Sequence, residues 1–216
     1  MADLFLVRHG ETVWHLENRY AGSTDIDLSH QGRTQAQALA RWARSANLDA
    51  MWCSELRRSL DTAAPCAKAS GLELKIDARL NEVGFGVGEG LTLDELEERF
   101  PQKAAAFQAD PVAHPLPGGE DLRAAAQRAV AVLGEIVHEF PRGRILVVSH
   151  NSLIRLALCQ ILNLPLTEYR NRFESVRNCH LNQVQITPGA PPALLQFNTP
   201  LRKSQAPTGE AEECLG

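Results

Sequence analysis

Short apolar runs recur along the chain and are separated by longer amphipathic stretches. Most runs are rich in aliphatic residues and end at polar or turn-forming residues, which is typical of buried strands. The run at 144–149 is apolar throughout from 145 to 148, which indicates a strand covered on both faces. The pattern predicts strands at 4–7, 48–53, 72–76, 144–149, 181–186 and 193–197.

Apolar residues at helical spacing fill the intervals between these runs. They predict helices at 30–45, 92–99, 101–109, 120–140 and 151–162, with one more after Leu56 that Pro65 kinks or restarts. Ser29 is a suitable N-cap for the first helix. Strands that alternate with helices predict an α/β fold, here a three-layer α/β/α sandwich around a mostly parallel sheet. The last two strands are too close in sequence for a crossover helix, so we expect an antiparallel edge.

Two long polar segments interrupt the regular pattern and are predicted to be loops. Residues 11–29 are rich in turn formers, and residues 81–90 contain four glycines. The chain has room for one sizeable domain, which we place at 1–202. Residues 203–216 hold too few apolar side chains to pack, and we expect this tail to be disordered.

The composition is that of an ordinary globular protein, and it narrows the function classes. Of 216 residues, 44% are hydrophobic and 22% are charged, and the net charge of −4 argues against nucleic acid or an acidic membrane as partner. The N-terminus lacks the features of a signal peptide, and no apolar run approaches the roughly 20 residues of a membrane span. We therefore expect a cytoplasmic protein without membrane contact. Five scattered cysteines without CxxC spacing favour reduced thiols over disulfides or a zinc site.

The carboxyl ends of the strands are where an open parallel sheet binds its ligands. Residues that directly follow the predicted strands are therefore candidates for one shared site, even though they come from distant parts of the sequence. These residues are Arg8, His9, Ser54, Arg58, Asn81, Glu82 and His150.

Two arginines, two histidines and a carboxylate together suit phosphoryl transfer. Guanidinium forks match phosphate oxygens and stay charged. A neutral imidazole can attack phosphorus, and a second one can stabilise the charge that develops on oxygen. A carboxylic acid can protonate the departing alkoxide and later deprotonate the attacking water. Because the side chains supply the positive charge themselves, we expect no metal ion and no other cofactor.

These residues lie in segments that resemble the histidine phosphatase superfamily, which includes the cofactor-dependent phosphoglycerate mutases. Residues 6–12, LVRHGET, are similar to the signature of that family, and the similarity extends to about residue 187. A lone Arg-His-Gly would be weak evidence, but several blocks in the family's order are strong evidence. The further blocks are at 27–29, 54–58, 80–82, 86–90, 117–120 and 148–155.

The resemblance implies a role for each matching residue. It makes His9 the phosphorylated nucleophile, and it places Arg8, Arg58 and His150 in the phosphate pocket. Glu82 takes the position of the proton donor. The catalytic residues implied in this way are His9, Glu82, His150, Arg8 and Arg58.

Three departures from the family pattern affect the rim of the site rather than its core catalytic groups. His15 stands where an asparagine is frequent and can still donate to phosphate, Asn151 replaces a glycine after the second histidine, and Gly88 replaces a tryptophan. Arg57, Glu120 and Arg155 are left open between bracing the site and a purely structural role. The expected substrate-binding residues are Arg8, His15, Arg58, His150 and Asn151.

The intact pocket and the short middle segment favour a metal-independent phosphomonoesterase that works through a phosphohistidine on His9. Only 35 positions separate Glu82 from Pro117, whereas the mutases of the family carry a longer insertion there that excludes water. Two alternatives stay open, a cofactor-dependent phosphoglycerate mutase and a non-catalytic binder of phosphorylated ligands. Residues 110–120 resemble those of small bacterial α-ribazole-5′-phosphate and sugar-phosphate phosphatases, so the expected partner is a small phosphorylated metabolite. A homodimer is left open.

Overall fold

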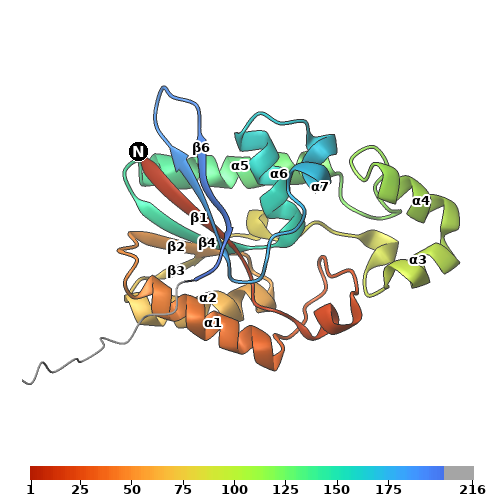
Figure 1. Ribbon diagram of the computed structural model, residues 1–216, viewed down its shortest axis with the longest axis horizontal. Helices are drawn as coiled ribbons and strands as arrows, with labels where there is room; N and C mark the ends of the chain where they lie inside the picture. The colour runs from red at the N-terminus through yellow and green to blue at the C-terminus, as the bar shows by residue number, and fades with distance from the viewer. Residues whose placement is uncertain (202–216) are drawn as a thin grey trace, which may run out of the picture.

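The computed structural model describes residues 1–201, in which one sheet has helices on both faces (Figure 1). The described part of the sheet has six strands in the order β3-β2-β4-β1-β5-β6. They are β1 (Ala2–Arg8), β2 (Ala50–Cys53), β3 (Leu74–Ile76), β4 (Arg144–Ser149), β5 (Leu181–Ile186) and β6 (Ala193–Thr199). The tail predicted to be disordered, 203–216, lies outside the described residues.

The strand pairings confirm the predicted sheet. β1, β2, β3 and β4 run parallel, while β5 is antiparallel to β1 and β6 is antiparallel to β5. In the pairing of β1 with β4, Arg8 lies opposite Ser149. The residues that follow these two, His9 and His150, therefore leave the sheet side by side at its carboxyl edge.

Four helices form the outer layers of the sandwich, two on each face of the sheet (Figure 1). They are α1 (His30–Ala43) and α2 (Arg57–Ser70) on one face, and α5 (Leu122–Glu139) and α6 (Asn151–Ile161) on the other. No helix among residues 1–201 is long and apolar enough to cross a membrane.

Side chains of β1 alternate between the two cores that these layers enclose. Leu4 and Leu6 belong to the core under α5 and α6, while Phe5 and Val7 belong to the core under α1 and α2. A central strand buried on both faces explains the nearly continuous apolar run in the sequence.

Several helices differ in detail from the sequence prediction, and the differences in α2 and α5 bear on the site. α2 runs through Pro65 without a break. α5 begins at Leu122 rather than at 120, because the Asp121 side chain caps it by accepting hydrogen bonds from the amides of Arg123 and Ala124. Glu120 is thus outside the helix and is available for other contacts.

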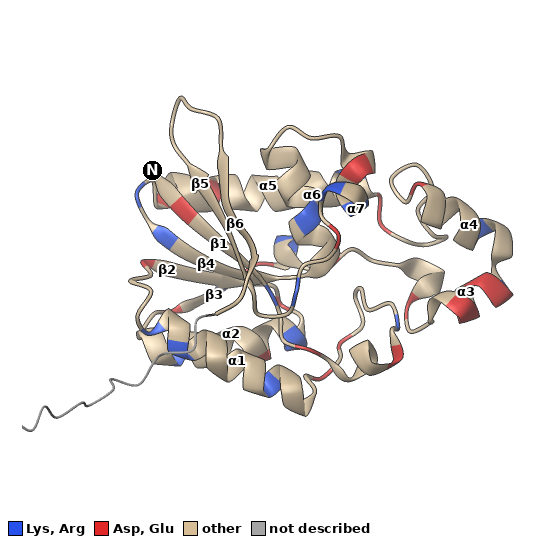
Figure 2. Ribbon diagram, in the orientation of Figure 1, with Lys and Arg blue, Asp and Glu red and all other residues tan. Residues whose placement is uncertain are grey.

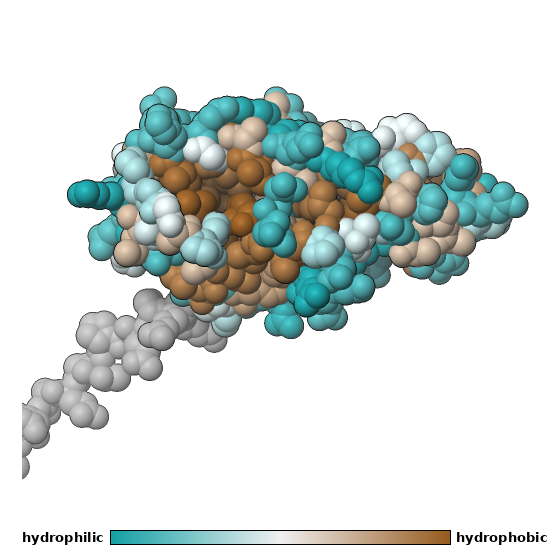
Figure 3. Space-filling model, turned by 90° about the horizontal axis from the view of Figure 1, so that it is seen from above, coloured by the Kyte–Doolittle hydropathy of each residue, from teal (hydrophilic) through white to brown (hydrophobic). Residues whose placement is uncertain are grey.

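A small lobe built from α3 (Leu93–Arg99) and α4 (Pro101–Ala109) projects from the sandwich (Figure 1). It has a core of its own, formed by Leu96, Ala104, Phe107 and Leu116. These side chains pack against one another inside the lobe. Seen from above, the apolar surface of the molecule is concentrated on the sandwich rather than on the lobe (Figure 3). Tyr20 and Phe85 pack against this core, so the lobe is attached to the segment after β1 and to the loop that carries Glu82.

Several short helices escape the sequence prediction because they are too short to show a period. A 3₁₀ segment at Val13–Glu17 lies inside the predicted loop 11–29. The others are the 3₁₀ segments Ala78–Leu80, Gly86–Gly88 and Leu166–Glu168, and the helix α7 (Tyr169–Arg172).

The segment that follows β1 lies directly against the first turn of α1. The Ser29 side chain accepts a hydrogen bond from the Gly32 amide and donates one to Glu11 Oε1 at 2.6 Å. A Cβ atom at Gly32 would lie 1.9 Å from the Glu11 carbonyl oxygen, and one at Gly10 would lie 2.5 Å from the Gly32 carbonyl oxygen. Glycine at both positions is therefore what allows the backbone after His9 to approach the helix so closely.

Candidate active site

Two histidines meet at the carboxyl edge of the sheet, as the register of β1 and β4 requires. The centroids of the His9 and His150 rings are 5.1 Å apart, and both residues are buried. The His9 backbone amide donates to the Ser149 carbonyl at 3.0 Å, and the Asn178 side chain donates to the His9 carbonyl at 2.8 Å. The backbone of His9 is thus fixed from both sides.

The His9 ring is oriented by a hydrogen bond to its own neighbour. Its Nδ1 lies 2.7 Å from the Gly10 carbonyl oxygen, which can only accept. Nδ1 therefore carries the proton of the neutral ring, and Nε2 keeps its lone pair. Burial is the main cause that holds the pKa of His9 well below its usual value, followed by the electrostatic effects of His150, Arg58 and Arg8. The ring is accordingly neutral and nucleophilic at neutral pH.

Arg58 lies on the first turn of α2 and is completely buried. Its guanidinium donates to the carbonyl oxygens of Thr24 at 2.9 Å and Gly22 at 2.6 Å. The Glu89 carboxylate holds the same loop by accepting from the amides of Gly22 and Ser23, both at 3.1 Å. This loop therefore positions Arg58 with backbone carbonyls, and no acidic residue within 1–201 forms an ion pair with it.

Arg8 and His15 form a second pair beside the nucleophile. Arg8 donates from Nη1 to the Val176 carbonyl at 2.9 Å, and its Nη2 contacts Nε2 of His15. The Nδ1 atom of His15 accepts from the Thr12 amide at 3.0 Å. Burial and the charges of Arg8 and Arg58 lower the pKa of His15 to about 4. Burial also lowers the pKa of Arg8 to about 10, which leaves the guanidinium charged at neutral pH.

Three buried donors around His9 have no hydrogen-bond partner among the described residues. Among residues 1–201, the unsatisfied buried side-chain nitrogens are Nε of Arg8, Nε of Arg58 and Nδ1 of His150, and one further unsatisfied atom is an oxygen of Gln196. Native proteins rarely leave buried donors unpaired. All three nitrogens belong to residues that surround the nucleophile, so the site is prepared for an anion with several oxygens.

The proton of His150 is also placed by a neighbour. Ser54 Oγ lies 2.6 Å from Nε2 of His150, and its hydroxyl can donate to this nitrogen. The neutral ring then carries its proton on Nδ1, which is the unsatisfied atom. Burial, together with the charges of Arg58 and Arg8, holds the pKa of His150 well below its usual value.

The Glu82 carboxyl group lies at the amino end of α6, next to His150. Its Oε1 accepts from the amides of Val83 at 2.9 Å and Leu153 at 3.0 Å, and its Oε2 accepts from the Ser152 amide at 3.0 Å. The residue is 7% exposed and lines the same cavity as His9. Backbone donors therefore hold the carboxyl group in place, which leaves its remaining lone pairs available to a ligand.

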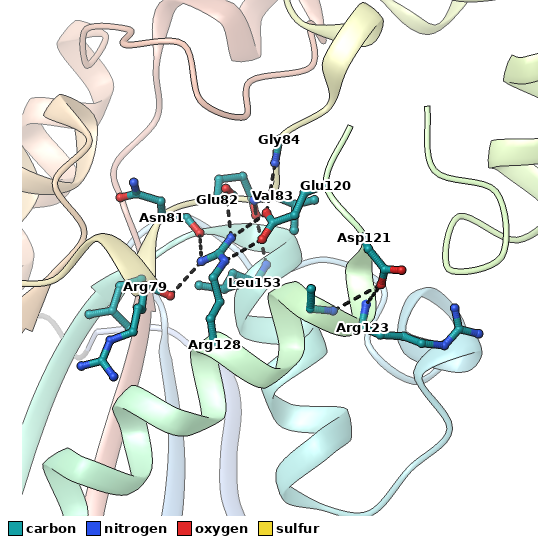
Figure 4. A network of polar contacts seen from close by, with 12 residues as sticks. Arg79, Asn81, Glu82, Val83, Gly84, Glu120, Asp121, Arg123, Arg128 and Leu153 are labelled. Atoms are coloured by element: carbon teal, nitrogen blue, oxygen red, sulfur yellow. Dashed lines mark hydrogen bonds and ion pairs between the residues drawn. The ribbon is translucent and has the colours of Figure 1, made fainter. Parts of the chain in front are cut away.

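Arg128 on α5 fixes the loop that carries Glu82, a role that the sequence did not reveal (Figure 4). It donates to the carbonyl oxygens of Arg79 at 2.7 Å and Asn81 at 2.8 Å. It also forms a two-point ion pair with Glu120, through bonds of 2.7 Å and 2.8 Å. The structure thus answers one open question from the sequence, because Glu120 braces the Glu82 loop through Arg128.

The structure brings most of the predicted site residues to one cavity of about 340 Å³. Arg58 and His150 are buried beside this cavity. Asn81 does not line the cavity, and its side chain donates to Glu55. Residues that the sequence did not single out also line it, including Tyr20, Tyr169 and Arg170, which cluster only through tertiary contacts. The predicted residues that line it are Arg8, His9, His15, Glu82 and Asn151.

Asn151 has a contact that the sequence could not predict. Its Oδ1 accepts from the Val176 amide at 2.8 Å, and the Val176 carbonyl in turn accepts from Arg8. The side-chain oxygen of Asn151, which the sequence predicted to bind substrate, therefore holds the segment that orients Arg8. Among residues 1–201 there is no cluster of three or more histidine, cysteine or acidic side chains that could hold a metal ion.

Comparison with known proteins identifies the family. The model of the histidine phosphatase superfamily, branch 1, matches residues 4–199. The chain belongs to this superfamily. The resemblance found in the sequence is thereby confirmed, and so is the expectation of a phosphatase-class enzyme.

Similar members of the superfamily carry different names. Phosphoserine phosphatase 1 of Hydrogenobacter thermophilus is 32% identical over 78% of this chain and 80% of its own length. The probable phosphoglycerate mutase GpmB of Salmonella choleraesuis is 33% identical over 85% of each chain. Among solved structures, a mycobacterial glucosyl-3-phosphoglycerate phosphatase has a TM-score of 0.82 at 28% identity, covering 92% of this chain and 99% of its own. The α-ribazole phosphatase of Shigella flexneri has a TM-score of 0.81 at 26% identity, covering 91% and 96%.

Lowering the pH from 7 to 5 should destabilise the fold. The pKa values of His9, His15 and His150 lie below the ordinary 6.5, so the unfolded chain binds protons below that pH while the folded chain does not. The free energy of unfolding should therefore fall with pH, by up to about 1.4 kcal/mol per pH unit for a fully buried ring and less for the partly exposed His15.

Urea unfolding at pH 7 and pH 5 measures this loss. His15→Asn removes one of the three rings and should make the pH dependence shallower, with the contribution of His15 ending near pH 4. Equal urea midpoints at the two pH values would show that these rings are not held neutral.

Proposed function

We propose that this enzyme hydrolyses small phosphomonoesters through a phosphohistidine on His9, with Glu82 as general acid and base and without a metal ion. The observation that carries the proposal is the set of unsatisfied buried donors on Arg8, Arg58 and His150 around a neutral histidine whose Nε2 lone pair is free. A phosphoryl group supplies the oxygens that these donors lack. The positive charge needed to stabilise the transition state then comes from side chains.

In the first step, the lone pair on Nε2 of His9 attacks phosphorus and forms an N–P bond. The bond from phosphorus to the ester oxygen breaks, and the Glu82 carboxylic acid gives its proton to the departing alkoxide. A protonated carboxyl group retains acceptor capacity, so the backbone amides that bind Glu82 can keep it in place during this transfer. Nδ1 of His9 keeps its proton and its bond to the Gly10 carbonyl.

In the second step, water attacks the phosphohistidine. Its proton passes to the Glu82 carboxylate, the N–P bond breaks, and inorganic phosphate leaves with the electron pair returned to Nε2. Glu82 is again a carboxylic acid, so every group ends as it began. Arg8, Arg58 and His150 donate to the non-bridging oxygens in both steps.

Hydrolysis rather than return of the phosphoryl group to substrate is supported by the short segment between Glu82 and Pro117. This segment forms the small α3–α4 lobe, whose apolar residues pack into their own core. The alternative hypothesis, a phosphoglycerate mutase, is supported by relatives that are named probable phosphoglycerate mutase. We propose hydrolysis as the main activity because this segment is short and, in the described structure, contributes just Phe85 and Leu93 to the cavity lining.

Histidine rather than cysteine is the nucleophile in this proposal. The cysteines among the described residues are buried free thiols, and burial raises the pKa of Cys53 and Cys66 to about 12. Protonated thiols are poor nucleophiles. Reduced thiols also fit a cytoplasmic setting, which we propose for this enzyme. As its partner we propose a small phosphorylated metabolite, and neither nucleic acid nor a membrane.

Acid-labile phosphate should accumulate on His9 during turnover. Rapid quenching with ³²P-labelled 4-nitrophenyl phosphate in the presence of EDTA, followed by peptide mapping, should place the label on the peptide that contains His9. His9→Asn should abolish the label and lower kcat by several orders of magnitude, because the nucleophile is gone.

Three results would contradict parts of this proposal. Label on another residue would refute His9 as nucleophile, and loss of activity in EDTA would refute metal independence. Sustained isomerisation of 3-phosphoglycerate with a bisphosphate primer, faster than phosphate release, would favour the mutase.

Removal of the proton donor should matter most for poor leaving groups. Glu82→Gln should lower kcat/KM for alkyl phosphates by about 10²- to 10⁴-fold, and much less for 4-nitrophenyl phosphate, whose leaving group needs little protonation. Arg128→Met should show the same dependence on leaving group with a smaller loss, because Arg128 holds the Glu82 loop.

Arg123→Met is the matched control for Arg128→Met. Arg123 lies on the same helix, and within the described part of the chain its side chain donates to the Val112 carbonyl alone, away from the Glu82 loop. It should leave the ratio between the two substrate types unchanged. A Glu82→Gln variant that slows both substrate types equally would show that Glu82 is not the general acid.

A further inference from the structure

Three arginines line the cavity in addition to Arg8, and two of them, Arg155 and Arg170, have no acidic partner among residues 1–201. Arg155 comes from α6 and Arg170 from α7, and both border the same cavity as His9 and Glu82. Figure 2 shows arginine positions on α6 and α7, whereas acidic positions gather on α3 in the projecting lobe. The cavity therefore carries positive charge beyond the phosphate pocket.

Two aromatic rings and two backbone carbonyls position these guanidinium groups. The guanidinium carbon of Arg155 lies 4.8 Å from the centroid of the Tyr169 ring, and that of Arg170 lies 4.7 Å from the centroid of the Phe107 ring and 5.7 Å from that of Tyr169. Nε of Arg155 donates to the Phe173 carbonyl at 2.7 Å, and Nη1 of Arg170 contacts the Phe107 carbonyl at 3.4 Å. Arg170 also donates from Nε to the Tyr169 hydroxyl at 3.1 Å. Contacts with the same tyrosine thus hold two like charges near each other, which is unfavourable unless an anion lies between them.

Neither arginine has an acidic partner among residues 1–201. Arg19, which also lines the cavity, is paired with Glu17 and Glu95. Among the described residues, Glu82 is the one acidic residue in the lining, and its side chain accepts hydrogen bonds from backbone amides rather than from either arginine.

Arg155 has the greater need of an anionic partner, because the residue is only 6% exposed. Burial is the main cause that lowers its pKa, because the charged form is less favourable away from water. An unpaired buried charge is costly, and buried charges are therefore normally paired, so a bound anion would supply the partner that Arg155 lacks.

We propose that the substrate carries a carboxylate in addition to its phosphate, and that Arg155 and Arg170 bind this carboxylate. The substrates are then small phosphorylated carboxylic acids. The proposal rests on the proposed function, in which Arg8 and Arg58 balance the two charges of the phosphate. Arg155 and Arg170 are left over for a second anion, and the planar guanidinium group matches a planar carboxylate. A cavity of about 340 Å³ is at the small end for ligand sites and fits a short carbon chain.

Two substrates that differ only in this carboxylate test the proposal. In glycerol 3-phosphate, a hydroxymethyl group replaces the carboxylate of 3-phosphoglycerate. The wild-type enzyme should show a kcat/KM at least about 10-fold higher for 3-phosphoglycerate, since a charge-assisted contact contributes about 1.5–3 kcal/mol. Arg170→Gln should lower kcat/KM for 3-phosphoglycerate by about 10- to 100-fold and reduce the preference toward unity.

Arg172→Gln is the matched control. Arg172 lies on the same short helix, pairs with Glu168 and is absent from the cavity lining, so its loss should leave the preference intact. Equal loss on both substrates in Arg170→Gln would show a purely structural role and overturn the proposal. A wild-type enzyme without preference for 3-phosphoglycerate would overturn it as well. Label on His9 from 4-nitrophenyl phosphate in the wild type separates this failure from a failure of the proposed function.

Discussion

Buried positive charge that the protein does not neutralise is the constraint on which the site depends. Arg58 is completely buried, yet its partners are backbone carbonyls rather than a carboxylate. Arg8 is likewise bonded to a carbonyl and to His15. Burial, together with these charges, lowers the pKa values of the neighbouring histidines and so keeps the His9 nucleophile neutral. The same arrangement that costs stability in the free protein thus prepares it to bind an anion and to attack phosphorus.

The fold holds these charges together through contacts that lie outside the chemistry. The register of β1 with β4 places His9 beside His150, and the glycines at 10 and 32 allow the loop after β1 to meet α1. Glu89 and Arg58 hold the loop at 22–24 from two sides. Arg128 and Glu120 hold the Glu82 loop, so that the carboxyl group reaches the amino end of α6. Rigid supports of this kind are needed to keep a buried charge in one geometry.

The sequence was sufficient for the sheet and for the residues at its carboxyl edge, because both depend on local patterns. Apolar runs predicted the strands, and the positions just after them predicted the meeting of His9, Arg58, Glu82 and His150. Contacts set by tertiary packing could not be predicted. Nothing in the pattern shows that Asn151 tethers the segment that orients Arg8. α7 is too short to have a period, yet it brings Arg170 to the cavity, and Arg128 lies on a helix whose pattern shows only its buried face.

The most direct test of this account is the effect of inorganic phosphate on stability, at constant ionic strength maintained with chloride. If the unsatisfied donors form a phosphate site, the free energy of unfolding of the wild type should rise with the logarithm of phosphate concentration, by about 1.4 kcal/mol per tenfold increase above the dissociation constant. Arg58→Met removes one of the donors and should abolish most of this rise. A wild-type stability that does not depend on phosphate, or an equal rise in Arg58→Met, would contradict the account.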